Sequence, residues 1–149
     1  MKRKATANWQ GTGMEGTGQL NTTSGVFNNQ PYSFKTRFKN EDGTLGTNPE
    51  ELIAAAYAGC FNMALSFQLQ GAGFIPENLH TEAILTMENS DGHFKITGIE
   101  LDLEATVPGL EEDKFLEVAA KAKNNCPVSQ ALSAIDIMLK ATLQTKTFN

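Results

Sequence analysis

The chain has 149 residues, a length typical of one domain. Hydrophobic residues make up 40% of it and charged residues 19%, which is a globular composition and excludes a disordered or fibrous chain. The formal net charge of -5 disfavours binding to phosphate backbones, so nucleic acid is not an expected partner.

Three short strands are predicted in the first forty residues, over 5–10, 18–22 and 31–39. The first residues are basic, but a polar segment follows them where a secretion signal would be apolar. We therefore expect a cytoplasmic protein, in which thiols are kept reduced. The repeated Gly-Thr-Gly of 11–13 and 16–18 favours a hairpin turn, because no Lys-Ser/Thr pair or following helix supports a phosphate-binding loop.

A long helix is predicted over 49–70, after a polar loop. Asn48 is a suitable cap, Glu51 completes the pattern of a capping box, and Gly71 or Gly73 ends the helix. Its interior is apolar nearly all round, which indicates burial on all sides. A membrane span is the competing interpretation, which the alanine-rich composition, the internal Asn and Gln residues and the lack of a second span disfavour. A chain of this size has little material to cover such a helix, so we expect a homodimer with this helix near the interface.

The second half combines strands and helices. The predicted elements are a strand pair over 81–87 and 93–107 joined by a turn at 89–92, an amphipathic helix over 110–124, a short helix from Cys126-Pro127 to Ser133, and a strand over 135–147. This order predicts an α+β fold with antiparallel pairing, in a single domain that spans 1–149.

Cys60 lies in the middle of the long helix, among apolar neighbours at helical spacing. A cysteine in such surroundings is more often a packing residue than a reactive one. Apolar surroundings raise the pKa of a thiol, and the helix dipole does not reach the middle of the helix. If Cys60 is reactive, a cation has to reach it from elsewhere in the fold.

Cys126 precedes Pro127, which marks the first position of a short helix, so Cys126 is a predicted N-cap. Free backbone N–H groups at that place favour a thiolate, although a small residue without chemistry is an equally good interpretation. The two cysteines form no CxxC unit. A bridge between them requires the fold to bring their Cα atoms within about 7 Å.

The residues around both cysteines resemble a known family. Segment 47–60 resembles the signature of the OsmC/Ohr family, the osmotically inducible and organic-hydroperoxide-resistance proteins, and 125–129 resembles that family's second cysteine motif. The resemblance continues through 24–26 and 31–38, so it covers almost the whole chain. It implies antiparallel sheets packed around the long central helix in an intertwined homodimer.

The resemblance also implies a function and a site. Family members of this kind reduce organic hydroperoxides, and by motif position Cys60 is the peroxidatic and Cys126 the resolving cysteine. Arg37 matches the arginine of the OsmC branch, and Glu50 matches the glutamate that pairs with it. The expected reductant is an external dithiol, a dihydrolipoyl group free or on a lipoylated protein, and no cofactor is expected to be bound. From spacing alone, Arg37 would be an exposed strand charge and Glu50 a carboxylate at a helix N-terminus.

Glu50 and Cys60 are ten residues apart on one predicted helix, which is about 15 Å along its axis. We therefore expect Arg37 and Glu50 of one subunit to complete the site around Cys60 of the other. One rival is a metal-binding module of both cysteines with His80 and His93, whose spacings are wrong for a zinc finger. Another is a non-catalytic redox sensor or binding protein, which would react once where an enzyme cycles.

Overall fold

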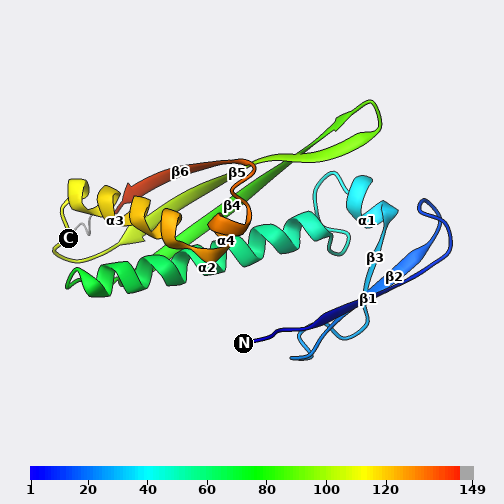
Figure 1. Cartoon of the computed structure of the whole chain (residues 1–149), viewed down its shortest axis with the longest axis horizontal. Helices are drawn as coiled ribbons and strands as arrows, with labels where there is room; N and C mark the ends of the chain where they lie inside the picture. Colours follow the sequence, from blue (N-terminus) through cyan, green and yellow to red (C-terminus); the bar gives the residue numbers. More distant parts are fainter. Residues whose placement is uncertain (145–149) are drawn as a thin grey trace. The chain divides into compact units, whose positions relative to one another are not determined.

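The computed structural model describes residues 1–144 of the chain (Figure 1). Its internal contacts divide it into two compact units, Met1–Leu52 and Ile53–Asn149. A three-stranded sheet lies in each unit, and helices accompany both sheets. The predicted α+β class is therefore confirmed.

The first unit holds an antiparallel sheet of three neighbouring strands. These are β1 (Ala5–Gln10), β2 (Thr17–Thr22) and β3 (Gln30–Ser33), in the order β1-β2-β3. The strands predicted over 5–10 and 18–22 are confirmed. The repeated Gly-Thr-Gly falls on the connection between β1 and β2 and on the start of β2, as a hairpin turn requires.

Gly18 leaves room for two aromatic rings against β2. A Cβ atom at this position would lie 2.5 Å from Tyr32 Cε1 and 2.7 Å from Trp9 Cε3, closer than carbon atoms can approach. The centroids of the Trp9 and Tyr32 rings are 5.4 Å apart, within the range of a stabilising aromatic pair. The second Gly-Thr-Gly therefore has a packing role as well as a place in the turn.

A short helix replaces the second half of the strand predicted over 31–39, so that half of the prediction is wrong. β3 ends at Ser33, and α1 spans Phe34–Phe38. Ser33 Oγ accepts a hydrogen bond from the Thr36 N–H at 3.2 Å, and Thr36 Oγ1 accepts one from the Ser33 N–H at 2.9 Å. This reciprocal capping box stabilises the helical turn. It places Arg37 on a helix instead of a strand.

The central helix α2 (Pro49–Gly71) agrees with its prediction at both ends. Asn48 Oδ1 accepts a hydrogen bond from the Glu51 N–H at 2.8 Å, which caps the helix. The Glu51 carboxylate accepts a hydrogen bond from Thr47 Oγ1 at 3.0 Å, so it is held at the start of α2 by a side chain rather than by the backbone of a capping box.

One face of α2 is buried within the chain. Its buried side chains recur every four residues, at Tyr57, Phe61, Leu65 and Leu69. Other apolar side chains of the helix stay open, since Met63 is 64% and Phe67 66% exposed. The helix is thus buried along one face rather than on all sides, and the homodimer that would cover the rest stays a prediction. By length and composition, α2 could also cross a membrane.

The sheet of the second unit has the order β4-β5-β6. β4 (Asn78–Ser90) and β5 (His93–Thr106) form the predicted antiparallel hairpin, with β4 longer than expected. Asp91 and Gly92 at its tip have φ values of 51° and 83°. Two positive φ angles are what a two-residue hairpin turn requires.

This second sheet is mixed, in contrast to the predicted antiparallel sheets, because β5 and β6 (Asp136–Leu143) run parallel. The chain passes between them through α3 (Glu112–Asn125) and α4 (Pro127–Ala131), and such a crossover leads to a parallel neighbour. The end of the predicted strand, 145–147, lies outside the described residues.

The core of the second unit lies between the helices and one face of the sheet, with α2 running along the sheet (Figure 1). The predicted apolar stripe of α3 is buried, as Phe115, Val118, Ala119 and Ala122. β5 supplies every second residue, as Ile99, Leu101, Leu103 and Ala105. Cys126 belongs to the same cluster, and Cys60 packs against it. The core therefore positions both cysteines.

Candidate redox site

The structure brings Cys60 and Cys126 together although 66 residues separate them. Their Sγ atoms are 2.8 Å apart and hydrogen-bonded, and both cysteines are free. Cys126 is fully buried, whereas Cys60 is partly exposed. The separation is less than an ångström longer than a disulfide bond of about 2.05 Å. A small movement would therefore let the two sulfur atoms bond, with Cys60 the one that solutes can reach.

The junction between α3 and α4 fixes the position of Cys126. Its N–H donates to the Ala122 carbonyl at 3.0 Å, and Pro127 follows at the first position of α4. Cys126 is the N-cap of α4, as predicted, but its side chain makes no capping hydrogen bond. The thiol is therefore directed at Cys60 rather than at the start of its own helix.

Burial raises the pKa of the Cys60 thiol above its ordinary value, and the Cys126 thiol beside it raises that pKa further. A backbone hydrogen bond from Val128, in the first turn of α4, acts in the opposite direction. The net direction is upward, so the neutral thiol is favoured. The expectation that Cys60 needs a cation from elsewhere in the fold therefore keeps its physical basis.

A second contact joins α2 to α4 one helical turn away from the sulfur atoms. The hydroxyl groups of Tyr57 and Ser129 form a hydrogen bond with each other in the buried interior. Burial raises the pKa of Tyr57, so this hydroxyl stays un-ionised where thiols titrate. No sequence pattern predicts this pair, because the two hydroxyl groups are 72 residues apart.

Arg37 and Glu50 form a bidentate ion pair in the first unit. Arg37 Nη2 donates to Glu50 Oε1 at 2.6 Å, and Arg37 Nε donates to Oε1 at 3.1 Å and to Oε2 at 3.2 Å. The Arg37 side chain remains 37% exposed, whereas that of Glu50 is 13% exposed. Two parallel contacts hold a guanidinium in one orientation. Its outer side stays open to a further ligand.

The four predicted site residues thus form two pairs, Cys60 with Cys126 and Arg37 with Glu50. Glu50 lies in the first turn of α2, which continues without interruption past Cys60. Ten residues of helix correspond to about 15 Å along the axis. The carboxylate that holds Arg37 is therefore three turns of helix away from the peroxidatic candidate on the same chain.

A cavity of about 230 Å³ lies beside Arg37 in the first unit. Four aromatic side chains line it, those of Trp9, Tyr32, Phe34 and Phe38. The Arg37 Cζ atom lies 4.9 Å from the centroid of the Phe38 ring, at cation–π distance. The sequence patterns assigned these aromatic residues no role in a site. The one pattern that relates to them is the repeated Gly-Thr-Gly, because one of its glycines makes room for two of the rings.

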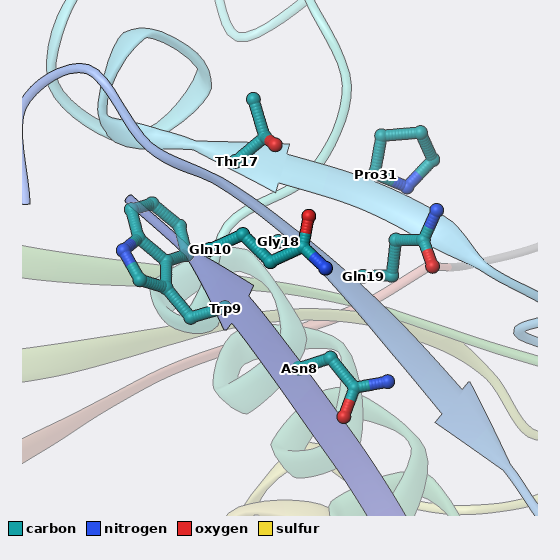
Figure 2. Close-up of a pocket in the computed structure, with 7 residues that line it drawn as sticks. All are labelled: Asn8, Trp9, Gln10, Thr17, Gly18, Gln19 and Pro31. Carbon is teal, nitrogen blue, oxygen red and sulfur yellow. The ribbon is translucent and has the colours of Figure 1, made fainter. Parts of the chain in front are cut away.

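A second hollow, of about 430 Å³, lies across β1, β2 and β3 (Figure 2). It shares Trp9 with the first cavity, but the amide side chains of Asn8, Gln10 and Gln19 give it a polar lining. Of these two hollows, the aromatic cavity combines an apolar wall with a guanidinium.

The predicted histidines do not join the cysteines. His80 pairs with Glu104 near one end of the β4–β5 hairpin, and His93 lies at the opposite end, beside the turn. Within residues 1–144, no group of three or more His, Cys, Asp or Glu side chains is arranged to hold a metal ion.

Two sulfur atoms within bonding reach, one of them accessible, define a class of protein. The chain is a dithiol protein with a close Cys60–Cys126 contact on an α+β scaffold. Comparison then identifies the family. Residues 40–140 match the model of the OsmC family, described as OsmC-like protein, and the chain belongs to this family.

Two bacterial relatives distinguish the branches of the family. Peroxiredoxin OsmC of Escherichia coli is 47% identical over 142 residues, which cover 93% of this chain and 97% of that protein. Organic hydroperoxide resistance protein OhrB of Bacillus subtilis is 33% identical, over 67% of this chain and 73% of the relative. The higher identity over more of the chain favours the OsmC branch, as the position of Arg37 does.

Solved structures share the fold. The crystal structure of OhrB of Bacillus subtilis superposes with a TM-score of 0.72 at 27% identity, covering 93% of this chain and 98% of that one. An OsmC-like protein from Mycoplasma pneumoniae reaches a TM-score of 0.74 at 17% identity, over 97% and 99% of the two chains, and so supports the fold alone. Thiol-dependent reduction of peroxides is the activity that the sequence relatives support.

Proposed function

We propose that this protein is a thiol-dependent peroxidase that reduces organic hydroperoxides to alcohols through a Cys60–Cys126 disulfide. The observation that carries the proposal is the 2.8 Å separation of two free thiols that are remote in the sequence. A packing role for both cysteines would not require their sulfur atoms to meet.

In the first step, the Cys60 thiolate attacks the terminal oxygen of the hydroperoxide. The O–O bond breaks, the alkoxide leaves and takes a proton to become the alcohol, and Cys60 becomes a sulfenic acid. In the second step, the Cys126 sulfur attacks the Cys60 sulfur, the S–O bond breaks and water leaves. An external dithiol then reduces the disulfide and is itself oxidised. A dihydrolipoyl group is our proposed donor, and the cytoplasm is our proposed compartment.

The cation for the first step comes from a second copy of the chain. Burial disfavours the Cys60 thiolate, so a nearby guanidinium has to offset it. Arg37 has an open outer side and a fixed orientation, but Glu50, which holds it, is about 15 Å from Cys60 along α2. A homodimer in which Arg37 and Glu50 of one subunit face Cys60 of the other satisfies both conditions. It would also cover apolar residues of α2 such as Met63 and Phe67.

The aromatic cavity beside Arg37 supports a preference for peroxides with an organic group. Four aromatic side chains line about 230 Å³ next to the guanidinium that polarises the peroxide. An alkyl or aryl group gains free energy by leaving water for such a wall, and hydrogen peroxide has no such group.

A coupled peroxidase assay tests the function. Turnover is measured with cumene hydroperoxide and with hydrogen peroxide, using dihydrolipoamide, and glutathione as the alternative reductant. We expect repeated turnover and a higher kcat/KM for cumene hydroperoxide. A single equivalent of peroxide consumed per chain, with every reductant in excess, would favour a sensor over an enzyme.

Trp9 offers a separate test of the cavity, because it is the single tryptophan of the chain. In a Cys60→Ser variant, cumyl alcohol should change the Trp9 fluorescence in a saturable way, whereas tert-butanol, with less apolar surface, should bind more weakly. Equal, non-saturating responses to both alcohols would remove the cavity from the proposal and leave the thiol chemistry standing.

A further inference from the structure

We propose that Tyr57 and Ser129 are a positioning pair for the resolving step: their buried hydrogen bond holds α4 against α2 and so sets how readily Cys126 reaches Cys60. Tyr57 lies three residues before Cys60 on α2, and Ser129 lies three residues after Cys126 on the α4 side. Residues three apart share one face of a helix. The hydroxyl pair and the sulfur pair are therefore parallel links between the same two segments, one helical turn apart.

Both hydroxyl groups depend on this bond. Tyr57 is 0% and Ser129 8% exposed, and no buried side-chain N or O atom within residues 1–144 lacks a hydrogen-bond partner. A buried hydroxyl without a partner is costly, so the two groups stay paired only while α4 keeps its place. The hydrogen bond thus fixes the orientation of α4 as well as its distance from α2, which apolar packing alone does not.

The segment that carries Cys126 needs such a link. α4 has five residues, Pro127–Ala131, too few for its own backbone hydrogen bonds to hold it as a stable helix. Its apolar attachment to the core comes from Val128, which is partly buried, and from Leu132 just beyond its end. Two polar contacts orient this turn on α2. One is the hydrogen bond of Ser129 with Tyr57, and the other is the hydrogen bond from the Val128 N–H to Cys60.

Orientation matters because two reactions compete for the Cys60 sulfenic acid. Attack by Cys126 forms the disulfide and releases water, as the proposed function requires. A second hydroperoxide instead transfers an oxygen atom to Cys60, which becomes a sulfinic acid, and leaves as an alcohol. The first reaction is intramolecular, so its rate follows the effective concentration of Cys126 at Cys60. A looser α4 lowers that concentration, whereas the second reaction does not use Cys126.

The inference rests on the proposed function for the sulfenic acid, but its main test does not. The full-length Tyr57→Phe and Ser129→Ala variants are equilibrated with a thiol–disulfide buffer, and the reduction potential of the Cys60–Cys126 disulfide is measured. We expect an effective concentration lower by about tenfold in each, which makes the potential less negative by about 30 mV. With excess cumene hydroperoxide, we expect a several-fold larger fraction of Cys60 sulfinic acid by mass spectrometry.

Thr81→Val is the matched control. Thr81 Oγ1 donates to Asn62 Oδ1 at 2.6 Å, so this variant also removes a hydroxyl that is bonded to α2, but from the side of β4 rather than α4. It should lower the thermal midpoint in a comparable way and leave the potential at the wild-type value. If a single variant fails to fold, the double variant Tyr57→Phe/Ser129→Ala leaves no unpaired hydroxyl and should show the same shift in potential.

The outcomes separate the two proposals. A potential in the double variant equal to that of Thr81→Val overturns the positioning role, whatever the peroxidase assay shows. A shifted potential without any peroxidase turnover supports the positioning pair and rejects the proposed function instead.

Discussion

At the residue scale, Cys60 combines two opposing requirements. The thiolate is the nucleophile toward a peroxide, yet burial raises the pKa of this thiol and the backbone of Val128 offsets only part of the rise. Under the proposed function, the same apolar surroundings would favour a substrate with an organic group. In the proposed mechanism, the reactivity of Cys60 therefore depends on a nearby cation, and Arg37 is the candidate whose orientation is already fixed.

Arg37→Met should move the ionisation of Cys60 to higher pH. Loss of a neighbouring positive charge disfavours the thiolate, so at any given pH below the Cys60 pKa the variant contains less of it. Alkylation of Cys60 by iodoacetamide, followed from pH 5 to 10, should rise later than in the wild type, and kcat/KM should fall about a hundredfold. Lys35→Met, on the same short helix, is the control and should follow the wild-type curve. Identical curves for both variants would show that Arg37 does not act on Cys60.

Substitution of each of the two cysteines should change the consumption of hydroperoxide in a different way. Cys60→Ser removes the nucleophile, so no hydroperoxide should be consumed. Cys126→Ser keeps the nucleophile but removes the resolving sulfur, so one equivalent of hydroperoxide per chain should be consumed as Cys60 becomes a sulfenic acid, and at most a second equivalent if it goes on to the sulfinic acid. Peroxide consumption under single-turnover conditions measures both. Repeated, near-normal turnover in either variant contradicts the mechanism.

At the element scale, sequence patterns predicted the long elements and the short helix α4 but missed the short helix α1. Asn48 and Pro49 predicted the start of α2, and the Asp91-Gly92 pair predicted the β4–β5 turn, because these signals act over a few residues. The aromatic and β-branched residues of 34–38 favour a strand, whereas the Ser33–Thr36 capping box stabilises the helical turn that the structure has. The parallel pairing of β6 depends on the path of α3 and α4, which no local pattern contains.

Ser33→Ala tests how far α1 depends on that capping box. A five-residue helix has little stability of its own, and removal of a capping hydroxyl costs about 1 kcal/mol. Because α1 carries Arg37, we expect a several-fold lower kcat/KM for cumene hydroperoxide and a reduced free energy of unfolding in urea. Ser33→Thr keeps the acceptor and should restore most of both. Full activity in the alanine variant would show that the Arg37–Glu50 ion pair holds α1 without the cap.

The candidate site shows the same limit of sequence reasoning. The two cysteine motifs identified Cys60 and Cys126, but their approach is a property of the folded core, since each lies on a different segment packed against β5 and its neighbours. The Tyr57–Ser129 hydrogen bond could not be predicted from the sequence for the same reason. Tyr57 reads as one more large residue on an apolar helix, and Ser129 reads as an ordinary residue of the first turn of α4, until the register between the two segments is known.

At the scale of the whole molecule, the two pairs of site residues belong to different units of the chain. Cys60 and Cys126 are neighbours in the second unit, and Arg37 and Glu50 are neighbours in the first. The helix α2 leaves apolar side chains exposed, including Phe67, and exposed apolar side chains that lie together mark interaction surfaces. A symmetric dimer would use one surface to cover these apolar side chains and to bring the two pairs of site residues together. Each subunit would supply its guanidinium to the other and receive one in return.

Mixed dimers provide the decisive measurement. Cys60→Ser chains keep Arg37, and Arg37→Met chains keep both cysteines, so each is nearly inactive alone. If the site forms across subunits, a mixed dimer contains one complete site. An equal mixture, after unfolding and refolding together, should therefore regain about a quarter of the wild-type activity per chain, since about half of the dimers are mixed. A mixture of Cys60→Ser with Cys126→Ser chains should regain nothing, because the dithiol lies within one chain and neither chain has both sulfur atoms. Recovery in the second mixture but not in the first would reverse the assignment, with the sulfur atoms meeting between subunits and the guanidinium acting within one.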